Sequence, residues 1–173
     1  MSSKQSQSLD SGTPWSEVEK FVADISAPLD IVGVGNPLRG DDGAGLEVAT
    51  LLRRRVDHRG GGVKVHVDPR APERLLSRLA ESRHRILVID AVDASRAPGS
   101  VVCARLSDTS FGFFATHNIP LRLIPGISSR AGEVLLVGIQ PLSIEFGEGL
   151  SEPVKAAVSR VVEALSRALE DGK

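Results

Sequence analysis

The sequence predicts an α/β protein: a three-layer sandwich with a mostly parallel five-stranded sheet and one antiparallel strand. Short apolar runs alternate with helical patterns along the chain, which is the order typical of βαβ units. The run at residues 85–92 is apolar on both faces, as central strands of parallel sheets are. The run at residues 101–106 follows after only eight residues, too few for a parallel crossover, so this strand is expected to be antiparallel.

The other elements follow from hydrophobic periodicity and from turn residues. Thr13 and Pro14 predict the start of an amphipathic helix that ends near Pro28, and residues 30–34 predict the first strand. Residues 1–29 are interpreted as an N-terminal extension with one helix, and residues 30–173 as a single α/β domain. A helix is expected next, with Leu46, Ala49, Leu52 and Val56 on its core face, followed by a strand at 63–67 and a short helix from Pro72 with core residues Leu75, Leu76 and Leu79. The last two expected elements are a strand at 133–139 and a helix at 153–169. The residues of that helix expected to face the sheet are Val154, Val158, Val161, Leu165 and Leu169.

Composition narrows the class of partner. The chain has 173 residues, 41% of them hydrophobic, which is enough for one compact core. A net charge of −1 gives no electrostatic footprint for nucleic acid or for an anionic membrane. The one cysteine, Cys103, lies in an apolar run and is expected to be a buried, inert thiol. Because the sequence shows neither a signal-peptide pattern nor an apolar run of about 18 residues, we expect a cytoplasmic protein without membrane insertion. We expect a monomer because no long heptad pattern is present.

A glycine-rich stretch at residues 31–45, IVGVGNPLRGDDGAG, follows the first predicted strand and precedes a helix. Gly33 and Gly35 give the first part of a dinucleotide fingerprint, but its third glycine would fall at Leu38. The adjacent carboxylates Asp41 and Asp42 would also repel a phosphate. These two features count against phosphate binding, but a non-proteolytic α/β nucleotide- or metal-binding module stays as the alternative interpretation.

Three aspartates follow the predicted parallel strands, so they are expected at one edge of the sheet. Asp42 follows the first strand, Asp68 ends the second, and Asp90 lies near the end of the third. A strand order of 2-1-3 opens a crevice beneath Asp42 and Asp90. Asp90 is a charge inside a buried strand, which is costly unless it is paired or coordinated, and the glycines around Asp42 leave it no obvious capping partner within the strand. Asp41 is more simply explained as a residue that supports the turn.

Histidine supplies a possible third ligand. His58, His66 and His84 are interpreted as surface or structural residues, whereas His117 lies where a loop enters a short predicted helix. Two carboxylates and one imidazole suit a divalent transition metal with open coordination positions. The sequence does not show whether the chain around His117 returns to the edge that carries the aspartates.

These motifs resemble the maturation endopeptidases of [NiFe]-hydrogenase large subunits. The resemblance spans residues 30–169 and rests on the glycine-rich stretch, on Leu87-Val88-Ile89-Asp90-Ala91 and on Thr116-His117-Asn118-x-Pro120. The turn Gly138-Ile139-Gln140-Pro141 and the upstream Ala71-Pro72-Glu73 are similar to the branch that processes hydrogenase-3-type enzymes. The family usually has a glycine pair where this chain has Pro69-Arg70, and the helix before Pro28 is additional.

The resemblance implies an endopeptidase that removes the C-terminal extension of a hydrogenase large-subunit precursor after nickel insertion. It implies that Asp42, Asp90 and His117 are the metal-contacting and catalytic positions, and that the nickel is contributed by the substrate while the free enzyme is metal-free. Two mechanisms remain open. Nickel acts as a Lewis acid on the carbonyl or on a bound water, or it serves for recognition while an aspartate acts as general base.

Overall fold

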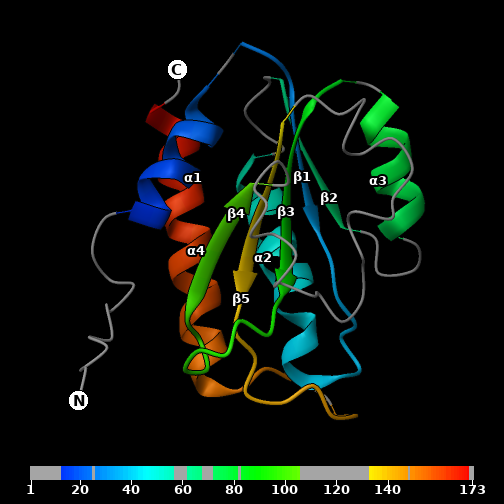
Figure 1. The fold of residues 1–173 in the computed structure, drawn as a ribbon, viewed down its shortest axis with the longest axis vertical. Helices are drawn as coiled ribbons and strands as arrows, with labels where there is room; N and C mark the ends of the chain where they lie inside the picture. The colour runs from blue at the N-terminus through cyan, green and yellow to red at the C-terminus, as the bar shows by residue number, and fades with distance from the viewer. Residues whose placement is uncertain are drawn as a thin grey trace, which may run out of the picture.

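Five strands form one sheet in the computed structural model, which describes residues 13–24, 26–56, 62–67, 72–81, 83–105, 133–147 and 149–171 (Figure 1). The strand order is β2-β1-β3-β5-β4, and only β4 runs antiparallel to its neighbour. This confirms the antiparallel strand predicted from the short connection, and it contains the 2-1-3 order under which a crevice was expected beneath Asp42 and Asp90. The strands are β1 (Leu29–Gly33), β2 (Val63–Val67), β3 (Arg85–Ala91), β4 (Val101–Arg105) and β5 (Val134–Ile139).

Helices cover both faces of the sheet, which confirms the predicted sandwich. Buried side chains of α1, α2 and α4 form one core cluster with one face of the sheet, and those of α3 form a second cluster with the opposite face. In Figure 1, α3 accordingly stands apart from α1 and α4. The helices are α1 (Thr13–Ala23), α2 (Ala44–Val56), α3 (Pro72–Glu81) and α4 (Glu152–Asp171).

Alternation along the central strands explains the two core clusters. Successive side chains in a strand point to opposite faces, so Ile31 packs in the cluster with α2 and α4 while Val32 packs in the cluster with α3. Every residue of β1, β3 and β5 is buried. Such strands read as continuous apolar runs, so a charged residue inside one of them is conspicuous.

The N-terminal helix is shorter than predicted and is fastened to the sheet. It ends at Ala23 rather than near Pro28. Directly after its end, the Asp24 carboxylate accepts a hydrogen bond from the backbone N–H of Ser26 at 2.8 Å. The buried guanidinium of Arg85, on β3, donates to the carbonyl oxygens of Phe21, Asp24 and Ala27. The Phe21 carbonyl lies in the last turn of α1, where carbonyls lack partners within the helix, and Asp24 and Ala27 belong to the segment that follows.

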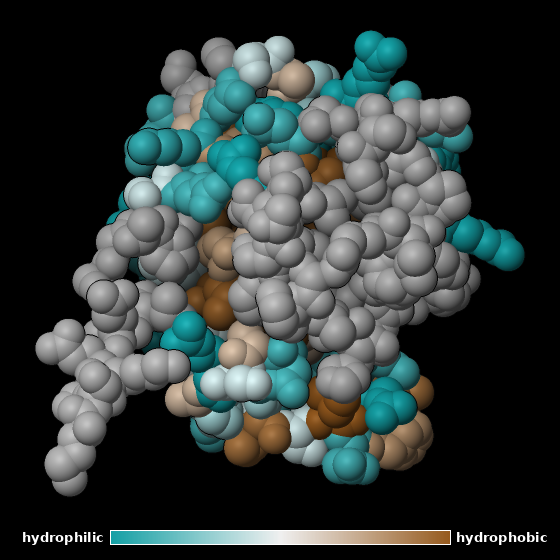
Figure 2. All heavy atoms as spheres, viewed as in Figure 1, coloured by the Kyte–Doolittle hydropathy of each residue, from teal (hydrophilic) through white to brown (hydrophobic). Residues whose placement is uncertain are grey.

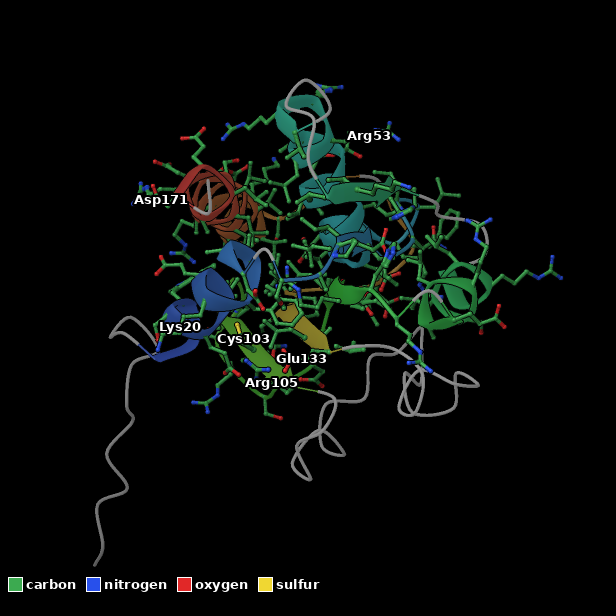
Figure 3. The ribbon with its side chains drawn as sticks, turned by 90° about the horizontal axis from the view of Figure 1, so that it is seen from above. Lys20, Arg53, Cys103, Arg105, Glu133 and Asp171 are labelled. Atoms are coloured by element: carbon green, nitrogen blue, oxygen red, sulfur yellow. The ribbon has the colours of Figure 1, made fainter. Side chains whose placement is uncertain are left out.

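A second arginine connects α1 to the edge of the sheet. Arg105 at the end of β4 donates to Glu17 on α1 at 2.5 Å and to Glu133 beside β5 at 3.0 Å. Figure 3 shows Arg105 and Cys103 on β4, next to α1. Burial, together with the charge of Glu17, raises the pKa of the Cys103 thiol to about 12, which keeps it protonated at neutral pH and agrees with the prediction of an inert thiol.

Other boundaries differ from the predicted ones by one or two residues. The first strand is Leu29–Gly33 instead of 30–34, and the last helix is Glu152–Asp171 instead of 153–169. Its residues Val154, Val158, Val161 and Leu165 are buried as predicted, whereas Leu169 is only partly buried. Within the described residues, no helix is both long enough and apolar enough to cross a membrane.

Candidate functional site

The glycine-rich stretch forms a tight turn that presses one helix start against two strands. After β1 the chain passes through a turn and a single turn of 3₁₀ helix, η1 (Gly40–Gly43), before α2 begins. Gly35 has φ 139°, and a Cβ there would lie 1.8 Å from the carbonyl oxygen of Asp42. A Cβ on Gly45 would lie 2.2 Å from the carbonyl oxygen of Ile89. The glycines are therefore required by close backbone packing, which brings the segment carrying Asp42 directly onto β1 and β3.

Asp42 lies in this turn with only 2% of its surface exposed. Its Oδ2 atom accepts a hydrogen bond from the backbone N–H of Asn36 at 2.9 Å. The sequence predicted no obvious partner for Asp42 within the strand, and the structure supplies one from the loop instead. This bond fixes the carboxylate in the turn at the carboxyl edge of the sheet.

Asp90 occupies the end of β3 beside this turn and is 1% exposed. Its Oδ1 atom accepts a hydrogen bond from the backbone N–H of Ala91 at 2.8 Å. Burial, and in second place the negative charge of Asp42, raises the pKa of Asp90 well above its ordinary value. The structure thus brings Asp42 and Asp90 together, as predicted, in a buried site where two negative charges disfavour each other.

Asp41 has a different role from its neighbour. Its two carboxylate oxygens accept hydrogen bonds from the backbone N–H groups of Leu142, Ser143 and Ser151 at 2.8, 3.2 and 2.6 Å, and from the Ser151 hydroxyl at 2.8 Å. These donors lie in the loop between β5 and α4. Asp41 therefore joins η1 to that loop: its role is structural, as interpreted, but the amides it binds belong to a distant loop and not to its own turn.

The remaining predicted site residues lie outside the described part of the chain. These are His117, proposed as the third ligand, and Asp68, which follows β2. Within the described ranges, no group of three or more His, Cys, Asp or Glu side chains is arranged to hold a metal ion. The described site is therefore the pair Asp42 and Asp90, together with the turn that supports it.

One further buried carboxylate, Asp30, was not singled out from the sequence. Asp30 in β1 is 1% exposed, and its Oδ1 and Oδ2 atoms are hydrogen-bonded to His66 Nε2 at 2.6 Å and to His84 Nδ1 at 2.7 Å. It lies toward the amino end of β1, away from the turn that carries Asp42. Both histidines are thus structural, as interpreted. The available signal was a charged residue inside an apolar strand, the same signal that drew attention to Asp90.

Replacing Asp30 by asparagine is expected to reduce stability by about 1–3 kcal/mol at pH 7, because an acceptor shared by two imidazoles is lost. Burial raises the pKa of Asp30, but the bonds from His66 and His84 outweigh it and lower the pKa overall. Because the pKa of Asp30 is lower in the folded protein than in the unfolded chain, where it is near 3.8, the Asp30 carboxylate stabilises the fold at pH values above 3.8. This stabilisation is lost as the pH falls through the pKa of the folded state. Urea unfolding at pH 7 and pH 3 measures this, with Lys64→Gln on β2 as control. An Asp30→Asn variant as stable as the wild type at pH 7 would contradict it.

A carboxylate pair held against the carboxyl edge of an α/β sandwich suits a hydrolytic or metal-contacting centre. Comparison with known proteins shows the class to which the protein belongs, the hydrogenase maturation proteases. The family of that description, HycI, matches residues 48–168. The hydrogenase 3 maturation protease of Escherichia coli K12 is 36% identical over 136 residues, 76% of this chain and 85% of that protein. A putative hydrogenase maturation protease of Methanocaldococcus jannaschii is 31% identical over 144 residues, 78% of this chain and 92% of that protein.

Solved structures agree with this class. The [NiFe] hydrogenase maturation protease HycI of Thermococcus kodakarensis KOD1 superposes with a TM-score of 0.76 at 27% identity, covering 89% of this chain and 99% of that one. The endopeptidase HycI of Escherichia coli gives 0.62 at 30% identity, covering 84% and 93%. The chain belongs to the HycI family of hydrogenase maturation proteases, and it is an endopeptidase of that family. The resemblance predicted from the sequence motifs is confirmed.

Proposed function

We propose that this protease removes the C-terminal extension of a [NiFe]-hydrogenase large-subunit precursor after nickel insertion, and that it recognises the substrate's nickel through Asp42, Asp90 and His117. One observation carries the proposal. Asp42 and Asp90 form a buried pair in which burial and the charge of Asp42 raise the pKa of Asp90. A divalent cation relieves this repulsion, because it brings positive charge next to both carboxylates.

In this proposal the enzyme selects nickel-loaded precursor because its own set of metal ligands is incomplete. Two carboxylates and one imidazole provide part of a coordination sphere, and the precursor provides the metal with its own ligands. The enzyme itself therefore carries little or no tightly bound nickel in this proposal. A precursor without nickel lacks the group that these side chains bind, so its peptide bond is not positioned for cleavage.

Hydrolysis adds one water across the scissile bond. The water oxygen attacks the carbonyl carbon, the C–N bond breaks, and a proton passes to the departing amine. In this proposal Asp42, whose carboxylate accepts a hydrogen bond from the Asn36 N–H, acts as the general base that takes a proton from the water. Nickel bound to the substrate either polarises the carbonyl and the water or only holds the precursor in place, and both routes use the same three residues.

The backbone amides at this edge argue against the nucleotide-binding alternative. Phosphate-binding loops direct free N–H groups at the anion. Here the N–H groups of Asn36, Leu142, Ser143 and Ser151 donate to the carboxylates of Asp41 and Asp42. The turn thus presents negative charge where a phosphate would need donors.

Nickel gating is tested by incubating the protein with nickel-loaded and with nickel-free precursor. We expect cleavage of the loaded form alone, because only it supplies a cation to Asp42 and Asp90. Intact-mass spectrometry detects loss of the C-terminal peptide, and metal analysis of the purified enzyme should give far less than one nickel per chain. Equal cleavage of both precursor forms would refute the gating.

A further inference from the structure

Three exposed apolar side chains lie on the two loops that adjoin η1, the turn that carries Asp42. In the described part of the chain the large hydrophobic residues that are exposed are Leu38, Leu142 and Phe146, with 48%, 60% and 84% of their surface accessible. Leu38 lies in the loop before η1, and the other two lie in the loop between β5 and α4. We call these three side chains the apolar rim. Their concentration on two loops at one edge of the sheet differs from the scattered exposure that is normal for single residues.

Backbone hydrogen bonds hold the two loops together. The N–H of Gly40 donates to the carbonyl oxygen of Gly147 at 2.8 Å, and the N–H of Gly147 donates to the carbonyl oxygen of Leu38 at 2.9 Å. Arg39 Nε donates to the carbonyl oxygen of Ile144 at 3.1 Å. The loop that carries Leu38 is therefore fixed beside the loop that carries Phe146.

The same two loops are tied to the candidate site. Asp41 accepts from the N–H of Leu142, and Asp42 is the next residue along η1. Figure 2 shows apolar surface at the lower end of the molecule, where Figure 1 places the loop that follows β5. Any protein that covers the apolar rim consequently also lies next to Asp42.

We propose that the apolar rim is the docking surface for an apolar stretch of the precursor's C-terminal segment, next to the bond that is cut. This inference rests on the proposed function. It adds a second element to recognition: the carboxylates bind the metal, and Leu142 and Phe146 bind side chains that flank the scissile bond. The exposed Arg39 borders the rim with a charged group, as polar groups border apolar anchors in protein interfaces.

The size of the rim favours a peptide segment over a second copy of the chain. Three partly exposed side chains offer roughly 300–400 Å², whereas a standard protein–protein interface buries about 800 Å² on each partner. A few anchoring side chains on an extended segment need no more than this. The position beside Asp42 also suits a substrate, because an enzyme whose copies covered this edge would block its own site.

The test compares the double variant Leu142→Ser/Phe146→Ser with the wild type on nickel-loaded precursor. Both residues are exposed, so the fold should not change. We expect KM to rise about tenfold or more while kcat stays within about twofold, because hot-spot apolar anchors act on binding. Glu145→Ser is the matched control, being exposed in the same loop, and it should leave KM unchanged. The single variant Phe146→Leu keeps an apolar side chain at this position and should therefore keep most of the wild-type affinity.

Each result decides the inference. An unchanged KM in the double variant would overturn the docking surface and leave the proposed function intact. If the wild type is a dimer by size-exclusion chromatography and the double variant a monomer, a second copy is the occupant and the inference fails. If the wild type does not cleave the precursor, the proposed function fails, and a pull-down with purified precursor decides docking separately. Binding lost only in the double variant supports docking, whereas equal binding or no binding by the wild type overturns it.

Discussion

Asp42→Asn and Asp90→Asn are each expected to abolish precursor processing, with a fall in rate of about a thousandfold or more, while the protein stays folded. Asparagine keeps the shape of the side chain and can still accept the hydrogen bonds from Asn36 and Ala91. It removes the negative charge that, in the proposed function, binds the substrate's nickel. Processing is measured by intact-mass spectrometry of nickel-loaded precursor, and folding by circular dichroism.

Asp90→Asn should in addition stabilise the free protein at neutral pH. The pKa of Asp90 is higher in the folded protein than in the unfolded chain, where it is near 3.8. The contribution of Asp90 to stability is therefore complete at pH values below 3.8 and is lost as the pH rises through the pKa of the folded state. Asparagine resembles the protonated form and escapes this loss. The Tm of the variant should exceed that of the wild type by about 2–4 °C for each kcal/mol recovered at pH 7, and the difference should shrink toward pH 4. Gain of stability with loss of activity is typical of a functional charge.

The control for this pair is Asp93→Asn. Asp93 follows β3 at the same edge of the sheet, but it is exposed and its carboxylate accepts from the Ser95 N–H in a local turn. It should process precursor at close to the wild-type rate. His117→Ala tests the third proposed ligand by the same assay. A folded Asp42→Asn/Asp90→Asn/His117→Ala variant with normal processing would refute the whole assignment.

Local sequence signals were enough to predict the architecture. The α/β class depended on the alternation of apolar strand-like runs with helical patterns, and the direction of β4 depended on the length of one connection. Both follow from chain geometry, which a single sequence contains. The pairing of Asp42 with Asp90 was predictable for the same reason, since parallel strands end at one edge.

Contacts between residues distant in sequence were not predictable in this way. Asp30 is bonded to His66 and His84, which lie 36 and 54 residues further along the chain, and no spacing rule relates them. The partners of Asp41 in the loop after β5 are more than 100 residues away. The sequence indicated that Asp41 supports the turn, but the choice of partner loop depends on tertiary packing, which also decides where the apolar rim lies.

Asp41→Ala should both destabilise the protein and impair processing. The variant leaves the N–H groups of Leu142, Ser143 and Ser151 without their carboxylate acceptor at a partly buried site. Loss of several bonds to one charged acceptor costs about 3–5 kcal/mol, and Tm should fall by on the order of 10 °C. Because η1 then moves relative to the loop after β5, Asp42 is displaced. A shift of about 1 Å at a catalytic group costs about a hundredfold in rate.

Two further variants separate displacement of Asp42 from general loss of stability. Ser151→Ala removes only the hydroxyl donor to Asp41 and keeps the three backbone bonds, so it should process precursor within a few-fold of the wild type. Asp41→Asn keeps one acceptor oxygen and should be intermediate in both Tm and rate. Assays well below the Tm of each variant ensure that every enzyme is folded. If Asp41→Ala were less stable but equally active under those conditions, the turn would not position Asp42, and Asp41 would serve the fold alone.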